Sequence, residues 1–147
     1  MEQILDHGER IARARLAELP KGTWSAEDYV DEDGIDLDKM LKIKVTVTIT
    51  DDEFVVDFTG SDPACKGPMN VPYGLTLGVS ALAFKGLTTP DWPANEGHFR
   101  PLKVIAPEGS LMHAVPPAPT FMLWTGILTP EVILKAVAQA MPDQIPA

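Results

Sequence analysis

Alternation of apolar and polar residues between Leu41 and Ile49 constrains the fold of this chain more than any other feature of its sequence. Every odd position is leucine, isoleucine or valine, and every even position is lysine or threonine. Successive side chains of a strand point to opposite faces of a sheet, so this segment predicts a strand with one buried and one solvated face. A polar turn at 50–53 and a second apolar run at 54–59 follow. We therefore expect an antiparallel hairpin over residues 41–59.

Residues 1–22 predict a helix followed by a turn. Apolar residues recur at spacings of three and four between Ile4 and Leu19, which is typical of a helix with one buried face. Pro20 and Gly22 then end the pattern, because proline cannot continue a helix and glycine favours the turn that follows.

The segment 23–40 is predicted to be an acidic loop. It includes a run of twelve residues, 27–38, with seven acids and no base. An EF-hand calcium loop is the sharper alternative, but its template demands acidic residues where Tyr29 and Met40 stand. A solvated acidic loop is therefore the better interpretation.

The remainder, residues 60–147, contains 13 of the 14 prolines and is expected to be a Pro-rich α/β part made of short elements. A Leu- and Ala-rich stretch at 76–85 predicts a buried helix, and 102–106 predicts a strand. The last helix should open with Thr129 as N-cap and Pro130 at the first helical position. The fold class is thus α+β: an N-terminal helix, an antiparallel β-hairpin, then mixed short strands and helices.

Charge and composition exclude several classes of partner. The chain has 21 acids against 12 bases, a net charge of −9, whereas nucleic acids and anionic membranes require a basic surface. The uncharged runs 67–84 and 109–130 are long enough to span a bilayer, but several prolines interrupt each of them. The N-terminus has no signal-peptide pattern, so we expect a soluble cytoplasmic protein.

Standard catalytic motifs are absent from the sequence, which has no phosphate-binding loop, no dinucleotide fingerprint and no nucleophile elbow. His7, His98 and His113 are scattered, so no pair has the spacing of metal ligands. The single cysteine, Cys65, excludes an internal disulfide. Its neighbour Lys66 would lower the thiol pKa, but an isolated cysteine usually only packs. We expect no cofactor or metal to be bound by these residues.

Four glycine- or proline-rich polar clusters interrupt the apolar segments. They are Asp57-Phe58-Thr59-Gly60-Ser61-Asp62-Pro63, Gly67-Pro68-Met69-Asn70, Asn95-Glu96-Gly97 and Pro107-Glu108-Gly109-Ser110. In this order and spacing they resemble the hydantoinase B family. The opening Ile4-Leu5-Asp6-His7-Gly8-Glu9-Arg10, Leu19-Pro20-Lys21-Gly22 and Asp31-Glu32-Asp33-Gly34 add to the resemblance. The family includes the B-type subunit of ATP-dependent N-methylhydantoinase, the matching half of 5-oxoprolinase, and subunits of acetone and acetophenone carboxylases.

The resemblance implies that residues 1–147 are a single fragment of a larger hydantoinase B-like domain. In the family, an A-type subunit or domain uses ATP, with Mg²⁺, to phosphorylate a hydantoin, lactam or enolisable carbonyl, and the B-type subunit completes hydrolysis or carboxylation. The implied partners are that A-type subunit and the remainder of the B-type chain, with self-association as a further possibility. Any divalent metal of the B-type subunit would bind N-terminal to these residues, so the fragment alone should be inactive.

One departure leaves the reaction open. Many hydrolase members carry a Gly-Asn pair shortly after the Pro116-Pro117 region, where this chain has Leu123-Trp124-Thr125. The sequence therefore does not decide between a hydrolase and a carboxylase. The alternative from another class is a non-catalytic subunit or interaction domain on the same scaffold.

Five polar residues are candidates for chemistry. Asn95 and Glu96 stand on a predicted turn, where they could orient a carbonyl and move a proton. Asp57 and Asp62 could bind a neighbouring loop or a cation, and Asn70 follows in the next cluster. The alternative for all of them is a turn residue whose side chain is satisfied by backbone groups.

The uncharged stretch 114–128 predicts a contact surface. It contains Phe121, Met122, Leu123 and Trp124, which would expose more apolar area than a small monomer usually does. We expect this stretch to pack against the remainder of the B-type chain or a second copy.

Overall fold

The computed structural model describes residues 1–121, 123–143 and 145 of the chain. Its elements in chain order are α1 (Glu2–Glu18), β1 (Gly22–Val30), β2 (Leu41–Ile49), β3 (Phe54–Asp57), α2 (Tyr73–Thr88), the 3-10 turn η1 (Glu96–Phe99), β4 (Leu102–Ile105) and α3 (Trp124–Ala138). The strands form one sheet in the order β1-β2-β3-β4. The β1/β2 and β2/β3 pairs are antiparallel and β3/β4 is parallel. The predicted α+β class is confirmed.

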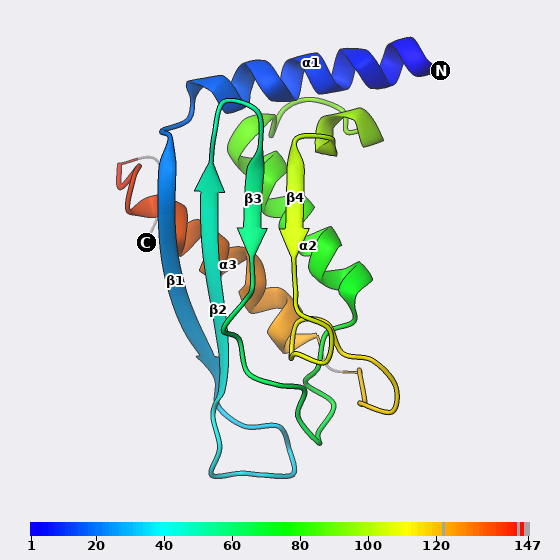
Figure 1. The fold of residues 1–147 in the computed structure, drawn as a ribbon, viewed down its shortest axis with the longest axis vertical. Coiled ribbons are helices and arrows are strands. Elements are labelled where there is room, and N and C mark those ends of the chain that lie inside the picture. Colours follow the sequence, from blue (N-terminus) through cyan, green and yellow to red (C-terminus); the bar gives the residue numbers. More distant parts are fainter. Residues whose placement is uncertain (122, 144, 146–147) are drawn as a thin grey trace.

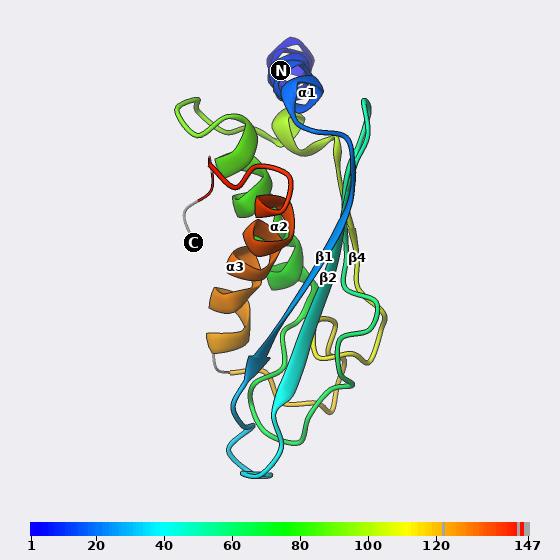
Figure 2. The same ribbon diagram turned by 90° about the vertical axis from the view of Figure 1, so that its left-hand side faces the viewer.

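The elements are arranged in two layers with a helix across one end. Helices α2 and α3 lie side by side on one face of the sheet, and α1 crosses its upper end (Figure 1). The opposite face of the sheet carries no helix in the described part of the chain (Figure 2). A sheet of this kind should alternate between core and solvent along each strand.

β2 lies at the centre of the core. Its five aliphatic side chains, at the odd positions of the predicted pattern, are at most 1% exposed. On the solvated face, hydroxyl groups pair across the strands: Thr46 with Ser25 at 2.9 Å and Thr48 with Thr23 at 3.0 Å. The predicted hairpin is confirmed, because β2 and β3 pair antiparallel across the turn 50–53.

The interpretation of residues 23–40 as a loop is wrong for 23–30, which form most of β1. Burial alternates along this strand as it does along β2, so each acid on the outer face stays in contact with solvent. Glu27 also lies directly across from Lys44, and an opposite-charge pair at this position supports the strand. The acidic loop is confined to 31–40.

Side chains from the helices protect both edges of the sheet. Two main-chain carbonyls of β1 accept hydrogen bonds from Lys135 and Gln139 of α3, at 3.1 and 2.7 Å. At the other edge, the hydroxyl of Tyr73 donates to the carbonyl of Val104 in β4 at 3.1 Å. Occupied edge carbonyls are poor templates for an added strand.

α2 confirms the helix predicted around 76–85 and extends it in both directions. Phe84 packs against Phe54 of β3 with ring centroids 5.3 Å apart. The hydroxyl of Thr76 donates to the carbonyl of Met112 at 2.6 Å, so the buried polar groups of α2 are used to fix a loop. None of the helices among the described residues is long and apolar enough to cross a membrane.

α3 begins five residues before its predicted start. Thr129 is not an N-cap, and Pro130 lies inside the helix, which opens at Trp124. The lost backbone hydrogen bond is outweighed by packing on both sides of the proline. Gly126 contacts Leu75 of α2, and the turn after Pro130 buries two aliphatic residues in the core.

The predicted contact surface is exposed. Phe121 is 84% and Trp124 is 57% exposed, whereas Met122 lies outside the described residues. The chain's own core therefore does not cover these aromatic side chains, and their partner stays a prediction.

Replacing Pro130 with alanine should stabilise the chain. The substitution restores an amide donor inside α3 and removes the ring from the path of the preceding turn, a gain of about 1–3 kcal/mol after the more flexible unfolded chain is allowed for. Urea unfolding followed by circular dichroism measures this. Pro142→Ala, outside the helix, is the control and should give no gain. An unchanged or lower midpoint for Pro130→Ala would show that the proline fits α3 without cost.

Candidate functional site

The predicted pair Asn95 and Glu96 lies at the start of η1, which packs against α1. Asn95 caps the turn: its Oδ1 accepts from the amide of Gly97 at 2.9 Å, and Nδ1 of His98 accepts from the amide of Asn95 at 3.2 Å. The Asn95 Nδ2 donates to the carbonyl of Ile4 in α1 at 3.3 Å. Both ends of the Asn95 amide are therefore engaged in joining η1 to α1.

Two glycines allow α1 to lie so close to the turn. A Cβ on Gly97 would overlap the carbonyl oxygen of Leu5, and a Cβ on Gly8 would overlap the side chain of Asn95. Glycine inside a helix costs about 0.5–1 kcal/mol relative to alanine. The close approach explains why Gly8 nevertheless stands in the middle of α1.

An ion-pair cluster orients the same junction. Nη1 of Arg100, just after η1, lies 2.9 Å from Oδ1 of Asp6 and 2.8 Å from Oε2 of Glu9, both in α1. The hydrogen bond from Arg100 lowers the pKa of the Glu9 carboxyl below its ordinary value, with a smaller contribution from Arg13. Exposed pairs contribute little to stability. The cap and the glycines therefore fix the junction, and the ion pairs set its orientation.

His98 is the buried member of the turn, at 3% exposure. Burial lowers the pKa of its imidazole, because the charged form would lose its hydration. The neutral ring is also what the geometry requires, since Nδ1 accepts the amide hydrogen of Asn95. Nε2 has no hydrogen-bond partner among the described residues.

Glu96 faces a groove between α2 and η1, here called the α2–η1 groove, of about 420 Å³. Its lining residues are Gly74, Leu77, Gly78, Ala81, Glu96, Phe99, Arg100 and Leu102. Glu96 is exposed and is the only acid among them. Across the described ranges, no hydrogen bond or ion pair involves its carboxylate. A rigid turn thus presents one carboxylate at an apolar wall, an arrangement suited to proton transfer.

The other three candidates all bind backbone groups. Oδ2 of Asp62 accepts from the amide of Lys42 at 2.9 Å, and Oδ1 of Asp57 accepts from the amide of Thr59 at 2.8 Å. Asn70 is 1% exposed and joins three loop segments. Its Oδ1 accepts from Cys65 N at 2.7 Å, and its Nδ2 donates to the carbonyls of Cys65, Gly67 and Pro119 at 2.9, 3.0 and 2.9 Å.

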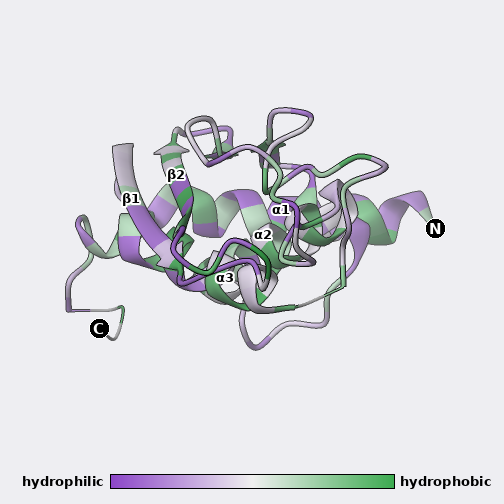
Figure 3. Cartoon of the chain, turned by 90° about the horizontal axis from the view of Figure 1, so that it is seen from below, coloured by the Kyte–Doolittle hydropathy of each residue, from purple (hydrophilic) through white to green (hydrophobic). Residues whose placement is uncertain are grey.

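The structure does not gather the five candidates into one site. Asn95 and Glu96 lie beside α1, whereas Asp57, Asp62 and Asn70 lie toward the end of the sheet where the long loops meet (Figure 1). Figure 3 looks onto that loop end. Only Glu96 combines exposure, a groove and a side chain without a partner in the described chain.

Asp33 is a buried acid that was not among the five candidates. It is 2% exposed, and its carboxylate accepts from the amides of Ile35, Asp36 and Gly67 at 2.8, 2.7 and 2.9 Å. These backbone hydrogen bonds, that of Asp36 first, lower its pKa to about 2. Both carboxylate oxygens are occupied, so Asp33 fixes the acidic loop to the 67–70 cluster.

The thiol of Cys65 is not activated by Lys66. Burial raises the pKa of Cys65, and the nearby Asp33 raises it further. The ammonium group of Lys66 instead pairs with Asp36 at 3.1 Å. The packing interpretation of this cysteine fits the structure better than a nucleophile.

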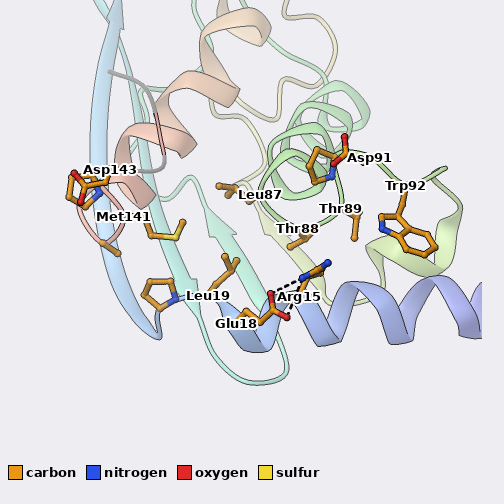
Figure 4. A pocket seen from close by; sticks show the side chains of 14 residues that line it. Arg15, Glu18, Leu19, Leu87, Thr88, Thr89, Asp91, Trp92, Met141 and Asp143 are labelled. Carbon is orange, nitrogen blue, oxygen red and sulfur yellow. Dashed lines mark hydrogen bonds and ion pairs between the residues drawn. The ribbon is translucent and has the colours of Figure 1, made fainter.

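A second hollow, of about 620 Å³, lies where the C-terminal ends of the three helices approach one another (Figure 4). Arg15 and Glu18 pair across its rim at 3.0 Å, and the buried hydroxyl of Thr89 has no partner among the described residues. None of the five candidates lines this hollow.

The described residues do not fit a metal or nucleotide–Mg²⁺ site of their own. Within residues 1–121, 123–143 and 145, no group of three or more His, Cys, Asp or Glu side chains could surround a metal ion. No step of the chemistry is therefore assigned to a metal held by these side chains.

Comparison with known proteins identifies relatives along the whole chain. Residues 1–147 match the family model described as Hydantoinase B/oxoprolinase. The B-type subunit of a D-/L-hydantoinase from Pseudomonas sp. (strain NS671) is 30% identical over 158 residues, which cover 99% of this chain and 26% of the relative.

Solved structures share the fold. An ATP-dependent caprolactamase from Pseudomonas jessenii aligns with a TM-score of 0.78 and 26% identity, over 99% of this chain and 24% of that chain. A nucleotide-free acetone carboxylase aligns with a TM-score of 0.76 and 17% identity, over 91% of this chain and 20% of that chain. The chain thus spans about a quarter or less of the proteins it matches.

The buried His98 should make stability fall at mildly acidic pH. The unfolded state takes up a proton near the ordinary pKa of 6.5, whereas the folded state resists until lower pH, so the free energy of unfolding decreases as pH falls from 7 to 5. Chemical unfolding across this range measures the slope. His98→Gln should flatten the slope and the exposed His7→Gln should keep it, whereas equal slopes for the two variants would contradict the assignment.

Proposed function

This chain belongs to the hydantoinase B/oxoprolinase family, and we propose that it forms the part of a B-type subunit that carries a proton-transfer residue beside the reacting carbonyl. The family and the structural relatives point to a region of ATP-dependent amidohydrolases or carboxylases. The complete protein would open a ring amide of the hydantoin, 5-oxoproline or lactam kind, or carboxylate a ketone.

The observation that carries the proposal is the likeness to the caprolactamase along 99% of the chain. Hydantoin, 5-oxoproline and caprolactam each contain an amide bond within a ring, so the names of the relatives share one bond type. An amide carbonyl is a weak electrophile, and activation at the expense of ATP is a chemical reason for such enzymes to use a second, ATP-using component. That component would be an A-type subunit or domain outside this chain.

Glu96 is the residue to which the geometry assigns a chemical role. In the complete assembly its carboxylate would take a proton from the nucleophile, which is water in hydrolysis and an enolisable carbon in carboxylation. The cap by Asn95 and the buried His98 keep the turn rigid, which favours a fixed distance between carboxylate and substrate. His98 and Asn95 act here as positioning residues.

A non-catalytic role is the second candidate, and one observation favours it. The side chains of Asn95, Asn70, Asp62 and Asp57 are all bound to backbone groups, as expected of a scaffold or interaction domain. Under this alternative Glu96 is a solvated turn residue.

The purified 147-residue chain should neither cleave ATP nor open 5-oxoproline or hydantoin rings. Its sequence contains no phosphate-binding loop, and the ATP-using step is proposed to take place on another subunit. Phosphate release and ring opening, followed with the chain alone, test this. Turnover above buffer that a point substitution in the chain abolishes would contradict the prediction.

In the complete assembly, Glu96→Gln should lower product formation by at least about tenfold. The amide keeps the shape but cannot accept the proton, and general-base catalysis typically contributes about 100- to 10,000-fold, part of which water can replace. ATP cleavage should continue, so the ratio of product to phosphate released should fall.

Glu108→Gln is the matched control for this experiment. Glu108 is also an exposed acid on a turn, but it does not line the α2–η1 groove. Its substitution should leave product formation unchanged. Normal coupled turnover of a folded Glu96→Gln assembly would favour the non-catalytic alternative.

A further inference from the structure

The outer face of α2 is apolar along nearly its whole length. From Gly67 to Phe84 the sequence has no charged residue. Leu77 and Leu82 are nevertheless 42% and 65% exposed. The one charged side chain of the helix, Lys85, turns its ammonium group onto the main-chain carbonyls of the segment that follows. Water would therefore meet almost only apolar side chains and glycine backbone on this face.

α1 of the same chain shows what a solvated helix looks like. Its exposed positions include Glu2, Arg10, Arg15 and Glu18, and its buried positions lie on the opposite side. A helix that is apolar all round is typical of a position covered on every side. The contrast indicates that the outer face of α2 is covered in the working protein.

The α2–η1 groove gives this face a shape into which another segment can fit. An ideal Cβ built on Gly74 or Gly78 meets no atom within 4 Å, so the groove is open along the glycine backbone. Leu77, Phe99 and Leu102 line it with apolar surface. An incoming apolar segment could approach the α2 backbone closely, because neither glycine has a side chain in the way.

We propose that the α2–η1 groove receives an apolar segment from the part of a hydantoinase B-type chain that lies outside these 147 residues. The length of the relatives favours this occupant over a second copy. The matched region makes up 26% of the hydantoinase subunit and 24% of the caprolactamase chain, so most of such a protein lies elsewhere in the same polypeptide. The docked segment would also bring its own side chains next to Glu96.

The sign of one small substitution tests the proposal in the full-length subunit. On a solvated helix, Gly78→Ala should raise the melting temperature, because alanine is the better helix former. Where a docked segment packs on the Gly78 backbone, the added methyl group has no room, and the melting temperature should fall by about 2 °C or more. We expect the fall, and a larger one for Gly78→Leu.

Gly86→Ala is the control, since Gly86 lies on the same helix, has no atom within 4 Å of its ideal Cβ and does not line the groove. It should raise the melting temperature. A rise for both variants would overturn the proposal, as would a reading frame that encodes nothing beyond these residues. Dimers of the 147-residue chain that Gly78→Leu dissociates would assign the groove to a second copy instead. The melting readout is separate from turnover, so it does not depend on the role of Glu96.

Discussion

The contact between α1 and the η1 turn is the interaction on which the proposed site depends. Gly8 and Gly97 bring two backbones together that are far apart in the sequence, and Asn95 then joins them with hydrogen bonds to both sides. A methyl group at either glycine would separate the helix from the turn. Without that contact the turn would lose its cap, and the carboxylate of Glu96 would no longer have a fixed position beside α2.

The loop end of the molecule is fixed by the same physical means, with buried polar side chains in place of regular secondary structure. Asn70 and Asp33 together bind amides and carbonyls of the acidic loop, the 65–70 cluster and the segment around Pro119. Thr125 adds a hydrogen bond of 2.6 Å to the carbonyl of Met69. Buried polar groups of this kind are costly unless satisfied, so each one specifies a single arrangement of its loops.

The sequence was sufficient for elements whose pattern is local. β2 alternates strictly and α1 has a clear helical period, so both were predicted with their surroundings. β1 was missed because its acids suggested a solvated loop, whereas Lys44 on β2 balances Glu27 only after the strands pair. The start of α3 was missed because the packing around Pro130 is tertiary, and a local rule favours proline at a helix start.

The site was predicted only in part, for a similar reason. Glu96 was found from its glycine-flanked turn, but the role of Asn95 as a cap depends on α1, and nothing near Asn95 in the sequence indicates that contact. Gly8, an interior helix glycine with no evident local use, was the one signal available. The central claim is that Glu96 stands at a reacting carbonyl. A structure of the complete subunit with bound 5-oxoproline tests it most directly. We predict a Glu96 oxygen within about 2.6–3.2 Å of the ring amide or of one bridging water. A ligand bound elsewhere, with Glu96 facing solvent, would contradict it.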